Sequence, residues 1–208
     1  MLLTDFVALF LRSWGPAPDL PARHLWRRWL VLVVLWPLLA LVLTINGLGL
    51  LLDHLLFPRF RRVAVDEPVF VLGVPRSGTT FLHRLLALDA ERFTTTALWE
   101  LVFAPSIIQR YFWTGVVRLD RLLGRPLGRS LYWLERRVLG GLDDIHSTGL
   151  AAPEEDYLAL AHVLGCFLQV LPFPEPRQWQ LAYADIRLDP VRKRRLMRFY
   201  RRFVQRHL

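Results

Sequence analysis

The sequence predicts an α/β domain built on a parallel sheet and preceded by a membrane helix. Residues 29–52 contain no formally charged side chain. Residues 68–80 have the pattern of a short apolar strand, a glycine-containing turn and the start of a helix, which is the order of a parallel α/β unit. We therefore expect three parts: an apolar or amphipathic segment at 1–28, a hydrophobic membrane segment at 29–57, and the N-terminal part of the α/β domain at 58–208.

The uncharged segment is long enough to cross a membrane. As a helix, residues 29–52 span about 36 Å, whereas the hydrocarbon core of a bilayer is about 30 Å thick. Trp26, Trp29 and Trp36 suit anchoring at the membrane interface. The segment starts too late and is too long for a cleaved signal peptide, so we expect it to stay in the membrane.

The remaining residues predict a sheet with few strands and many helices. Pro68–Leu72 is apolar on both faces, as a buried parallel strand is, and Thr94–Leu98 is a weaker second candidate. Because a parallel sheet needs several strands, we expect the chain to be an incomplete, mostly helical front part of a larger domain. Helices are expected at about 99–112, 115–123, 128–139, 154–169 and 191–207.

The composition favours anionic partners and argues against a metal site. The chain has 27 basic and 18 acidic residues and a formal net charge of +9. The last expected helix has a densely cationic face, which suits anionic lipid, an anionic acceptor or plain solvent; no nucleic-acid recognition module accompanies it. Cys166 is the only cysteine, which excludes an internal disulfide and a cysteine-based zinc site. The histidines lack metal-ligand spacing, so we expect no metal.

Gly73–Thr80 has the skeleton of a phosphate-binding loop. The pattern is G-x-x-x-x-G-K-[ST], with Thr79 in the place of the lysine. Gly73 and Gly78 permit a tight turn whose backbone amides meet the N-terminus of the following helix. Enzymes that use nucleoside triphosphates need that lysine on the β- and γ-phosphates, with Mg²⁺ beside it. Its replacement by Arg76 inside the loop suits a shorter anion held without metal; the plain alternative is an ordinary strand-to-helix turn.

The region Val69–Leu88, with Pro-Arg-Ser-Gly-Thr-Thr at 75–80, resembles the 5′-phosphosulfate loop of sulfotransferases that use 3′-phosphoadenosine 5′-phosphosulfate (PAPS). It most resembles the bacterial branch related to tyrosylprotein and carbohydrate sulfotransferases. The resemblance covers about Phe57–Leu208 and includes residues 98–101, 143–146 and 153–156. It implies a P-loop-type, nucleotide-kinase-like parallel sheet with flanking helices. It also implies PAPS as co-substrate and a hydroxyl-bearing small molecule, lipid or glycan as acceptor.

The resemblance assigns the donor site to the loop. Arg76, Ser77, Gly78, Thr79 and Thr80 would bind the phosphosulfate through backbone amides, hydroxyls and the guanidinium group. Arg76 would also be catalytic, because it would neutralise the charge that builds on the bridging oxygen as the sulfuryl group leaves.

A sulfuryl transfer to an alcohol also needs a base. The resemblance to the tyrosylprotein branch makes Glu100 the candidate catalytic base, and the alternative is a solvent-facing glutamate at a helix start. His83 and His146 are weaker candidates. The family's 3′-phosphate motif has no match after Leu150, so we expect that site to lie beyond Leu208.

Two other functions remain open: a nucleotide kinase with a degenerate loop, and a catalytically inactive, membrane-tethered interaction module. The missing lysine counts against the kinase, and the missing 3′-phosphate motif favours the inactive module. Because bacteria make PAPS in the cytoplasm, we expect an inner-membrane protein with a cytoplasmic catalytic part. A hairpin bent near Pro37 or Gly47, an in-plane helix, or a span with its N-terminus outside would give this topology. A lumenal or periplasmic domain behind a single span is the alternative.

Overall fold

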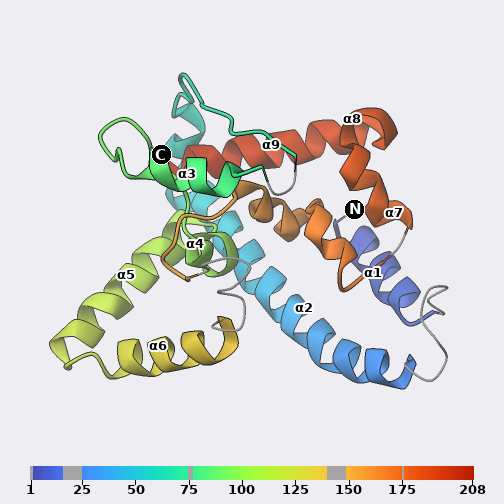
Figure 1. Ribbon diagram of the computed structural model, residues 1–208, viewed down its shortest axis with the longest axis horizontal. Helices are drawn as coiled ribbons and strands as arrows, with labels where there is room; N and C mark the ends of the chain where they lie inside the picture. Colours follow the sequence, from blue (N-terminus) through green and yellow to red (C-terminus); the bar gives the residue numbers. More distant parts are fainter. Residues whose placement is uncertain (1, 16–24, 75–76, 140–148, 175) are drawn as a thin grey trace. The chain divides into compact units, whose positions relative to one another are not determined.

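The computed structural model describes residues 2–15, 25–74, 77–139, 149–174 and 176–208. Over these ranges the protein consists of helices and the segments that connect them (Figure 1). The chain forms two compact units, each described here by itself. Unit 1 comprises Met1–Leu48 and Tyr157–Phe203, and unit 2 comprises Gly49–Asp156 and Val204–Leu208.

The helices of the described residues are mostly short, apart from the membrane-length helix and the C-terminal one. The α-helices are α1 (Leu2–Ser13), α2 (Leu25–Leu56), α3 (Thr79–Ala87), α4 (Leu98–Phe103), α5 (Ile107–Leu122), α6 (Pro126–Leu139), α7 (Pro176–Trp179), α8 (Ala184–Arg187) and α9 (Pro190–His207). The 3₁₀ helices are η2 (Pro58–Arg62), η4 (Asp156–Val163), η5 (Phe167–Val170) and η6 (Gln180–Tyr183).

In unit 1, α1 packs against α2 through the indole ring of Trp36. The rings of Phe6 and Phe10 meet it edge-on with centroids 5.2 Å away, and the ring of Phe173 lies at 4.8 Å. Trp36 Nε1 donates a buried hydrogen bond of 2.9 Å to Ser13 Oγ. Trp36 is therefore a core residue with its polar atom satisfied, and its expected place at the membrane interface is wrong.

Helix α2 is unbroken over 32 residues, with Pro37 inside it. Among the described residues, Trp26–Leu56 is the one helix long and apolar enough to cross a membrane, and few of its side chains are buried. A proline removes one intrahelical hydrogen bond, and here the helix continues on the others. The hairpin expected near Pro37 or Gly47 is therefore wrong.

Close packing explains why residue 49 is a glycine. Gly49 is the first α2 residue that belongs to unit 2. A Cβ atom at Gly49 would lie 2.6 Å from Ser106 Oγ and 2.8 Å from Gln109 Oε1. Such contacts are too short for real side chains, so the glycine lets α2 approach the first turn of α5. Ser106 caps that turn, because its Oγ accepts a hydrogen bond from the Gln109 amide at 3.3 Å.

The carboxylate of Asp53 joins three segments of unit 2. Its Oδ2 accepts a hydrogen bond from the Ile107 amide at 2.9 Å, and its Oδ1 accepts one from the Ile108 amide at 3.1 Å. Arg206 Nε donates to Oδ2 at 2.9 Å. The side chains of Asp53 and Arg206 are 0% and 3% exposed, so this ion pair is fully buried. It links α2, the N-terminus of α5 and the C-terminal turn of α9, where the amides and the guanidinium group both favour the negative charge.

The last turn of α9 makes further contacts in unit 2. The guanidinium of Arg206 lies over the ring of Phe60 at 4.1 Å from its centroid. Gln205 Nε2 donates to the carbonyls of Arg61 and Val63 at 3.2 and 2.9 Å. These contacts tie α9 to η2 and to the chain that follows it.

Helices α5 and α6 form a hairpin closed by Asp120. Gly124 and Arg125 have φ values of 83° and 63°, so the tight turn uses two residues in the left-handed region. Asp120 accepts hydrogen bonds from the amides of Leu127 and Gly128 at 2.8 and 2.9 Å. The carboxylate thereby satisfies two amides at the start of α6.

Several expected helices have different boundaries. The single helix expected at 99–112 is instead α4 and the start of α5, because Pro105 interrupts the chain and Ser106 caps a new helix. Helix α5 then continues through Gly115. The helix expected at 154–169 is wrong: two 3₁₀ helices replace it, separated at Leu164, whose φ of 53° no α-helix accommodates. The C-terminal helix is confirmed, with Asp189 Oδ2 accepting from the amides of residues 191 and 192 at 3.0 Å.

The expected parallel sheet is absent from the described part of the chain. Pro68–Leu72 has no regular structure, and all of its side chains except that of Val71 are exposed, with Leu72 at 87%. The second expected strand, Thr94–Leu98, contributes one antiparallel bridge between Ala97 and Pro153. A parallel strand is stable only with neighbours on its edges and cover on both faces. The described residues supply neither to Pro68–Leu72.

The buried ion pair predicts a large stability difference between two arginines of α9. In Arg206→Leu, the Asp53 carboxylate stays buried without its cation, which should cost about 3–5 kcal/mol. Arg201→Leu changes an exposed arginine of the same helix and should stay within about 0.5 kcal/mol of the wild type. Thermal unfolding in detergent, followed by tryptophan fluorescence, checks both variants. Equal melting temperatures for the two would contradict the role assigned to the pair.

Candidate active site

The loop before α3 begins at Gly73, which lies close to side chains at the other end of the loop. A Cβ atom at Gly73 would lie 2.5 Å from Ser77 Oγ and 2.6 Å from Thr79 Cγ2. The Ser77 amide donates to the Val74 carbonyl at 3.2 Å. Ser77 and Thr79 therefore lie close to Gly73. Arg76, the candidate donor-binding and catalytic arginine, lies outside the described residues.

The same loop leads directly into the N-terminus of α3. Gly78 precedes the helix with φ 84°, a left-handed conformation that glycine adopts without strain. The first hydrogen bond of the helix runs from the Leu82 amide to the Gly78 carbonyl at 3.0 Å. The amides of Thr79 and Thr80 lie ahead of it and have no acceptor within the helix. With the hydroxyls of Ser77, Thr79 and Thr80, they form a set of donors at the positive end of the helix dipole.

Glu100 lies in the first turn of α4 and is largely buried. Its Oε2 accepts a hydrogen bond from the Ala97 amide at 2.8 Å. Its Oε1 lies 4.0 Å from Arg110 Nη1 and 3.9 Å from His207 Nδ1. One oxygen therefore holds the start of the helix, and the other faces two basic side chains.

Arg110 and His207 are both mostly buried beside Glu100. Burial lowers the pKa of Arg110, while Glu100 and then Asp53 act in the opposite direction. Burial also lowers the pKa of His207, against the opposing effect of Glu100. Because the pKa of His207 falls below the ordinary value of 6.5, the ring is neutral at pH 7. Arg110 is then the cation of this cluster, and it also donates to the carbonyl groups of Arg206 and His207.

Two separate hydrogen bonds to neighbouring threonines lie between this cluster and α3. His207 Nε2 and Thr94 Oγ1 lie 2.8 Å apart, and His83 Nε2 and Thr95 Oγ1 lie 2.6 Å apart. Thr94 and Thr95 are neighbours in the sequence. Thr94 therefore contacts His207 of the cluster, and Thr95 contacts His83, one turn into the helix whose N-terminus carries the loop.

The sequence analysis missed Arg110 and His207. Arg110 looked like one more arginine of an arginine-rich chain, and His207 stands at the end of a basic helix without any motif. The structure brings both to Glu100, which was a candidate. His146, the other histidine candidate, lies outside the described residues.

Within the described ranges, no three His, Cys, Asp or Glu side chains are grouped so that they could hold a metal ion. Cys166 is buried, and burial raises the pKa of its thiol. A thiol in this environment stays protonated at neutral pH and is a weak nucleophile.

Comparison with known proteins identifies the family. A family model described as the sulfotransferase family matches residues 68–183, which is more than half of the chain. Searches of curated proteins and of solved structures each found no match. The matched range includes the glycine loop, the helix that it caps, Glu100 and Arg110. The chain therefore belongs to the sulfotransferase family.

Proposed function

We propose that this chain transfers a sulfuryl group from PAPS to a hydroxyl-bearing acceptor. The observation that carries the proposal is that the family match spans the loop 73–80, whose described residues include a glycine with positive φ at the N-terminus of α3. Sulfotransferases generally use PAPS as their donor. The alternative function, a nucleotide kinase, lacks support in the loop, because Thr79 replaces the phosphate-binding lysine.

The described loop residues fit the phosphosulfate end of such a donor. Gly73 lies against the side chains of Ser77 and Thr79, and Gly78 adopts a positive φ, so neither glycine places a side chain over the backbone amides. Ser77, Gly78, Thr79 and Thr80 would hold the anion through amides and hydroxyls. Arg76 would add the charge-assisted contact that a phosphosulfate requires.

The proposed chemistry divides between two residues. Glu100 takes the proton from the acceptor hydroxyl as its oxygen bonds to sulfur. Arg76 stabilises the negative charge on the phosphate oxygen as the bond from that oxygen to sulfur breaks. The acceptor oxygen ends in the sulfate ester, the proton ends on Glu100, and the electron pair ends on the leaving phosphate. The Oε1 atom of Glu100 is the one available for this step in the proposal, since Oε2 holds the Ala97 amide.

Arg110 and His207 would hold the carboxylate of Glu100 in place before the transfer. Arg110 Nη1 lies 4.0 Å from Oε1, within the range of an ion pair. A neutral His207 places no second full charge at the same oxygen. These are positioning roles in the proposal, because each residue would act through Glu100.

We further propose that Pro68–Leu72 is a strand of a P-loop-type parallel sheet in the active molecule. Val69, Phe70 and Leu72 are exposed, although they are apolar and directly precede the loop. Covering such side chains is favourable by about 25 cal/mol for each Å² of apolar surface. A strand in this position would also hold Gly73 rigidly at the donor.

The membrane helix suggests where the reaction takes place. We propose that α2 anchors the protein to a bacterial inner membrane and that the catalytic part lies in the cytoplasm, where PAPS is made. Since the hairpin is excluded, an in-plane helix or a span with an outside N-terminus remains. A lipid, a glycan or a small hydroxyl compound near the membrane would be the acceptor.

Replacing Arg76 tests the donor site. Arg76→Ala should weaken PAPS binding by about 1.5–3 kcal/mol, because it removes one charge-assisted contact, and it should lower turnover further. Arg92→Ala, at an exposed arginine of unit 2, is the matched control and should leave both unchanged. Calorimetry and initial rates measure the two effects. Equal behaviour of the two variants, or binding of Mg·ATP in place of PAPS, would contradict the assignment.

Replacing Glu100 tests the base. Glu100→Gln keeps an oxygen for the Ala97 amide and removes the proton acceptor, so turnover should fall by about 10²–10⁴-fold while PAPS affinity persists. Glu91→Gln, at an exposed glutamate, serves as the control and should retain wild-type turnover. Initial rates across pH and donor titrations provide the readout. Wild-type rates in Glu100→Gln would assign the base elsewhere, with His146 the next residue to replace.

Protease accessibility tests the topology. Arg59, Arg61 and Arg62 are exposed and follow the membrane helix, so trypsin should cut there once it has access. In intact spheroplasts we expect these sites to be protected, and in lysed spheroplasts we expect cleavage. Immunoblotting of the fragments measures both. Cleavage in intact spheroplasts would place the catalytic part outside the cytoplasm.

A further inference from the structure

The hairpin of α5 and α6 in unit 2, residues 107–139, leaves an apolar stripe exposed on each helix. Both helices repeat apolar residues at the i, i+4, i+7 spacing of one helix face. These residues are Phe112, Val116 and Leu119 in α5 and Leu127, Leu131 and Leu134 in α6. All except Val116 are exposed, Leu119 by 58% and Leu131 by 51%. The described residues therefore leave both stripes uncovered, and an apolar surface of this extent indicates a binding site.

The exposed charges of the hairpin are all positive. Over residues 111–137, each exposed charged side chain is an arginine: Arg118, Arg121, Arg125, Arg129, Arg136 and Arg137. The acidic residues of this range are Asp120 and Glu135, and both are engaged within unit 2. Asp120 binds amides at the start of α6, and Glu135 Oε1 accepts a hydrogen bond from the Leu150 amide at 2.7 Å. At 3.6 residues per turn, Arg121 and Arg136 lie opposite the stripes of their helices. Each helix therefore has an apolar side and a cationic side.

Two of the arginines of α6 stack on aromatic rings. The guanidinium of Arg136 lies 5.9 Å from the ring centroid of Tyr132, and that of Arg137 lies 5.5 Å from the ring centroid of Trp133. A guanidinium that stacks through its face can still donate to phosphate oxygens through the N–H groups of its edge. Tryptophan and tyrosine are enriched at the headgroup level of membranes. These pairs therefore suit the surface of a bilayer.

Within unit 2, the hairpin begins at the end of the membrane-length helix. Asp53, close to the end of α2, binds the first two amides of α5, and the ring of Phe57 stacks on that of Tyr111 at 5.8 Å. In the proposed anchor, α2 ends at the membrane surface, whether it spans the bilayer or lies in its plane. The start of α5 is then at that surface as well, a step that rests on the proposed anchor.

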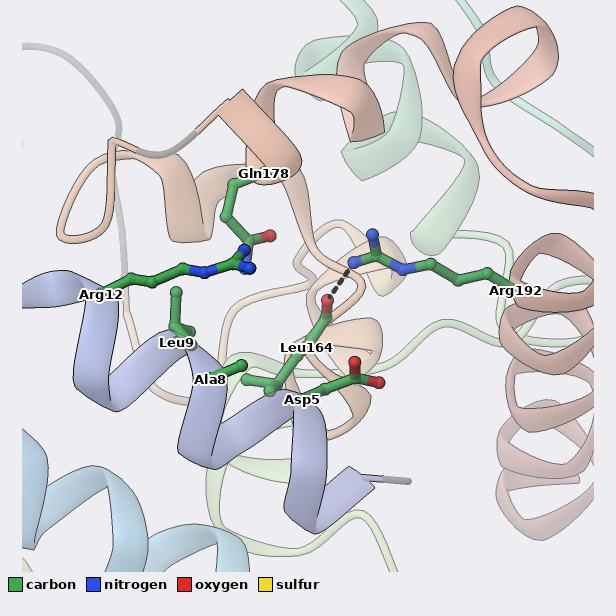
Figure 2. A pocket seen from close by; sticks show the side chains of 7 residues that line it. All are labelled: Asp5, Ala8, Leu9, Arg12, Leu164, Gln178 and Arg192. Atoms are coloured by element: carbon green, nitrogen blue, oxygen red, sulfur yellow. Dashed lines mark hydrogen bonds between the residues drawn. The ribbon is translucent and has the colours of Figure 1, made fainter.

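The basic helix α9 does not combine the same two features. Leu196 and Phe203 of its apolar side are only 6% and 3% exposed, so this side belongs to the core. Its Arg192 donates to the Leu164 carbonyl at 3.1 Å, beside a pocket of about 20 Å³ with room for one water molecule (Figure 2). The α5–α6 hairpin is therefore the better candidate for a membrane contact.

We propose that the α5–α6 hairpin docks on an anionic phospholipid surface. Its two stripes lie at the boundary of the acyl chains, and its arginines lie among the headgroups. Helices with leucine and aromatic residues on one side and arginine on the other bind membranes in this way. Each arginine near an anionic surface strengthens the contact by about a factor of five. The contact goes beyond sulfuryl transfer, and its test requires no activity.

Fluorescent labels on single cysteines test the proposal with the full chain in vesicles. Leu119→Cys places the label on the stripe of α5, and Thr114→Cys places it on the opposite, exposed side of the same helix. Cys166 is buried, so the unsubstituted chain is the labelling blank. In vesicles with phosphatidylglycerol, a nitroxide on the lipid acyl chains should quench the label at position 119, and acrylamide in the water should quench the label at position 114. In pure phosphatidylcholine, acrylamide should quench both.

Two pairs of arginine replacements test the role of the charge. At the phosphatidylglycerol fraction that gives half-maximal lipid quenching at position 119, Arg129→Gln with Arg136→Gln should lower the ratio of docked to undocked hairpin about 25-fold, or about fivefold for each arginine. Arg194→Gln with Arg198→Gln removes the same charge from exposed positions of α9 and should leave the quenching unchanged. The two pairs have equal net charge, so a difference between them identifies the hairpin.

The opposite results overturn the proposal. Quenching at position 119 by acrylamide alone would show that the stripe faces water. Protection from both quenchers would show that protein covers it, either a second copy or another part of the chain. Equal lipid quenching in the two kinds of vesicle, or equal effects of the two arginine pairs, would exclude anionic lipid as the partner.

A label on α2 separates this contact from the anchor. Leu41→Cys changes an exposed residue of α2, and its label should be quenched by the lipid nitroxide. Lipid quenching at position 41 without lipid quenching at position 119 would overturn the hairpin contact and leave the anchor. Lipid quenching at position 119 alone would support the hairpin contact and remove the anchor.

Discussion

The carboxylate of Asp53 is the point on which unit 2 depends. It is fully buried, and it accepts hydrogen bonds from two amides at the start of α5 and from the guanidinium of Arg206. A buried carboxylate is tolerated only when each oxygen has strong donors, and here a helix N-terminus and an arginine provide them. The same contact sets the end of α2 and the last turn of α9. His207 follows Arg206 directly, so the ion pair also places the imidazole that meets Glu100.

The consequence for the site is that its parts come from distant segments of the sequence. Glu100 and Arg110 belong to α4 and α5, and His207 is the penultimate residue of the chain. The α5 start is held by Asp53, and the His207 ring is held by Thr94. The positions of the residues around Glu100 therefore depend on the contacts of Asp53, which belongs to the membrane-length helix α2.

The sequence predicts local structure well where a single residue decides it. Asp189 before Pro190 begins the C-terminal helix as expected, and the uncharged segment is one long helix. Gly78 has the positive φ that a glycine in this loop suggests. The expected helix at 154–169 is wrong, because its apolar pattern does not reveal that Leu164 adopts a left-handed conformation.

Long-range features were beyond prediction for a physical reason. An aspartate inside an apolar helix predicts a partner but does not identify it, and Arg206 is one of many arginines. Likewise, the family resemblance suggested Glu100 as the base, but nothing in the sequence pointed to Arg110 and His207 as its neighbours. The sheet depended on strands that the described residues do not form. The family match indicates a sulfotransferase because it covers both the loop and the residues that surround it in the sequence.

The most direct measurement is the transfer of label from ³⁵S-labelled PAPS by the purified chain in detergent or in membranes. Hydroxyl-bearing lipids, glycans and small alcohols serve as acceptors, and γ-³²P-labelled Mg·ATP serves as the alternative donor. We expect ³⁵S to appear in a hydroxyl acceptor as a sulfate ester, with no transfer of ³²P. Transfer of ³²P, or no transfer of ³⁵S to any acceptor in the series, would contradict sulfuryl transfer by this protein.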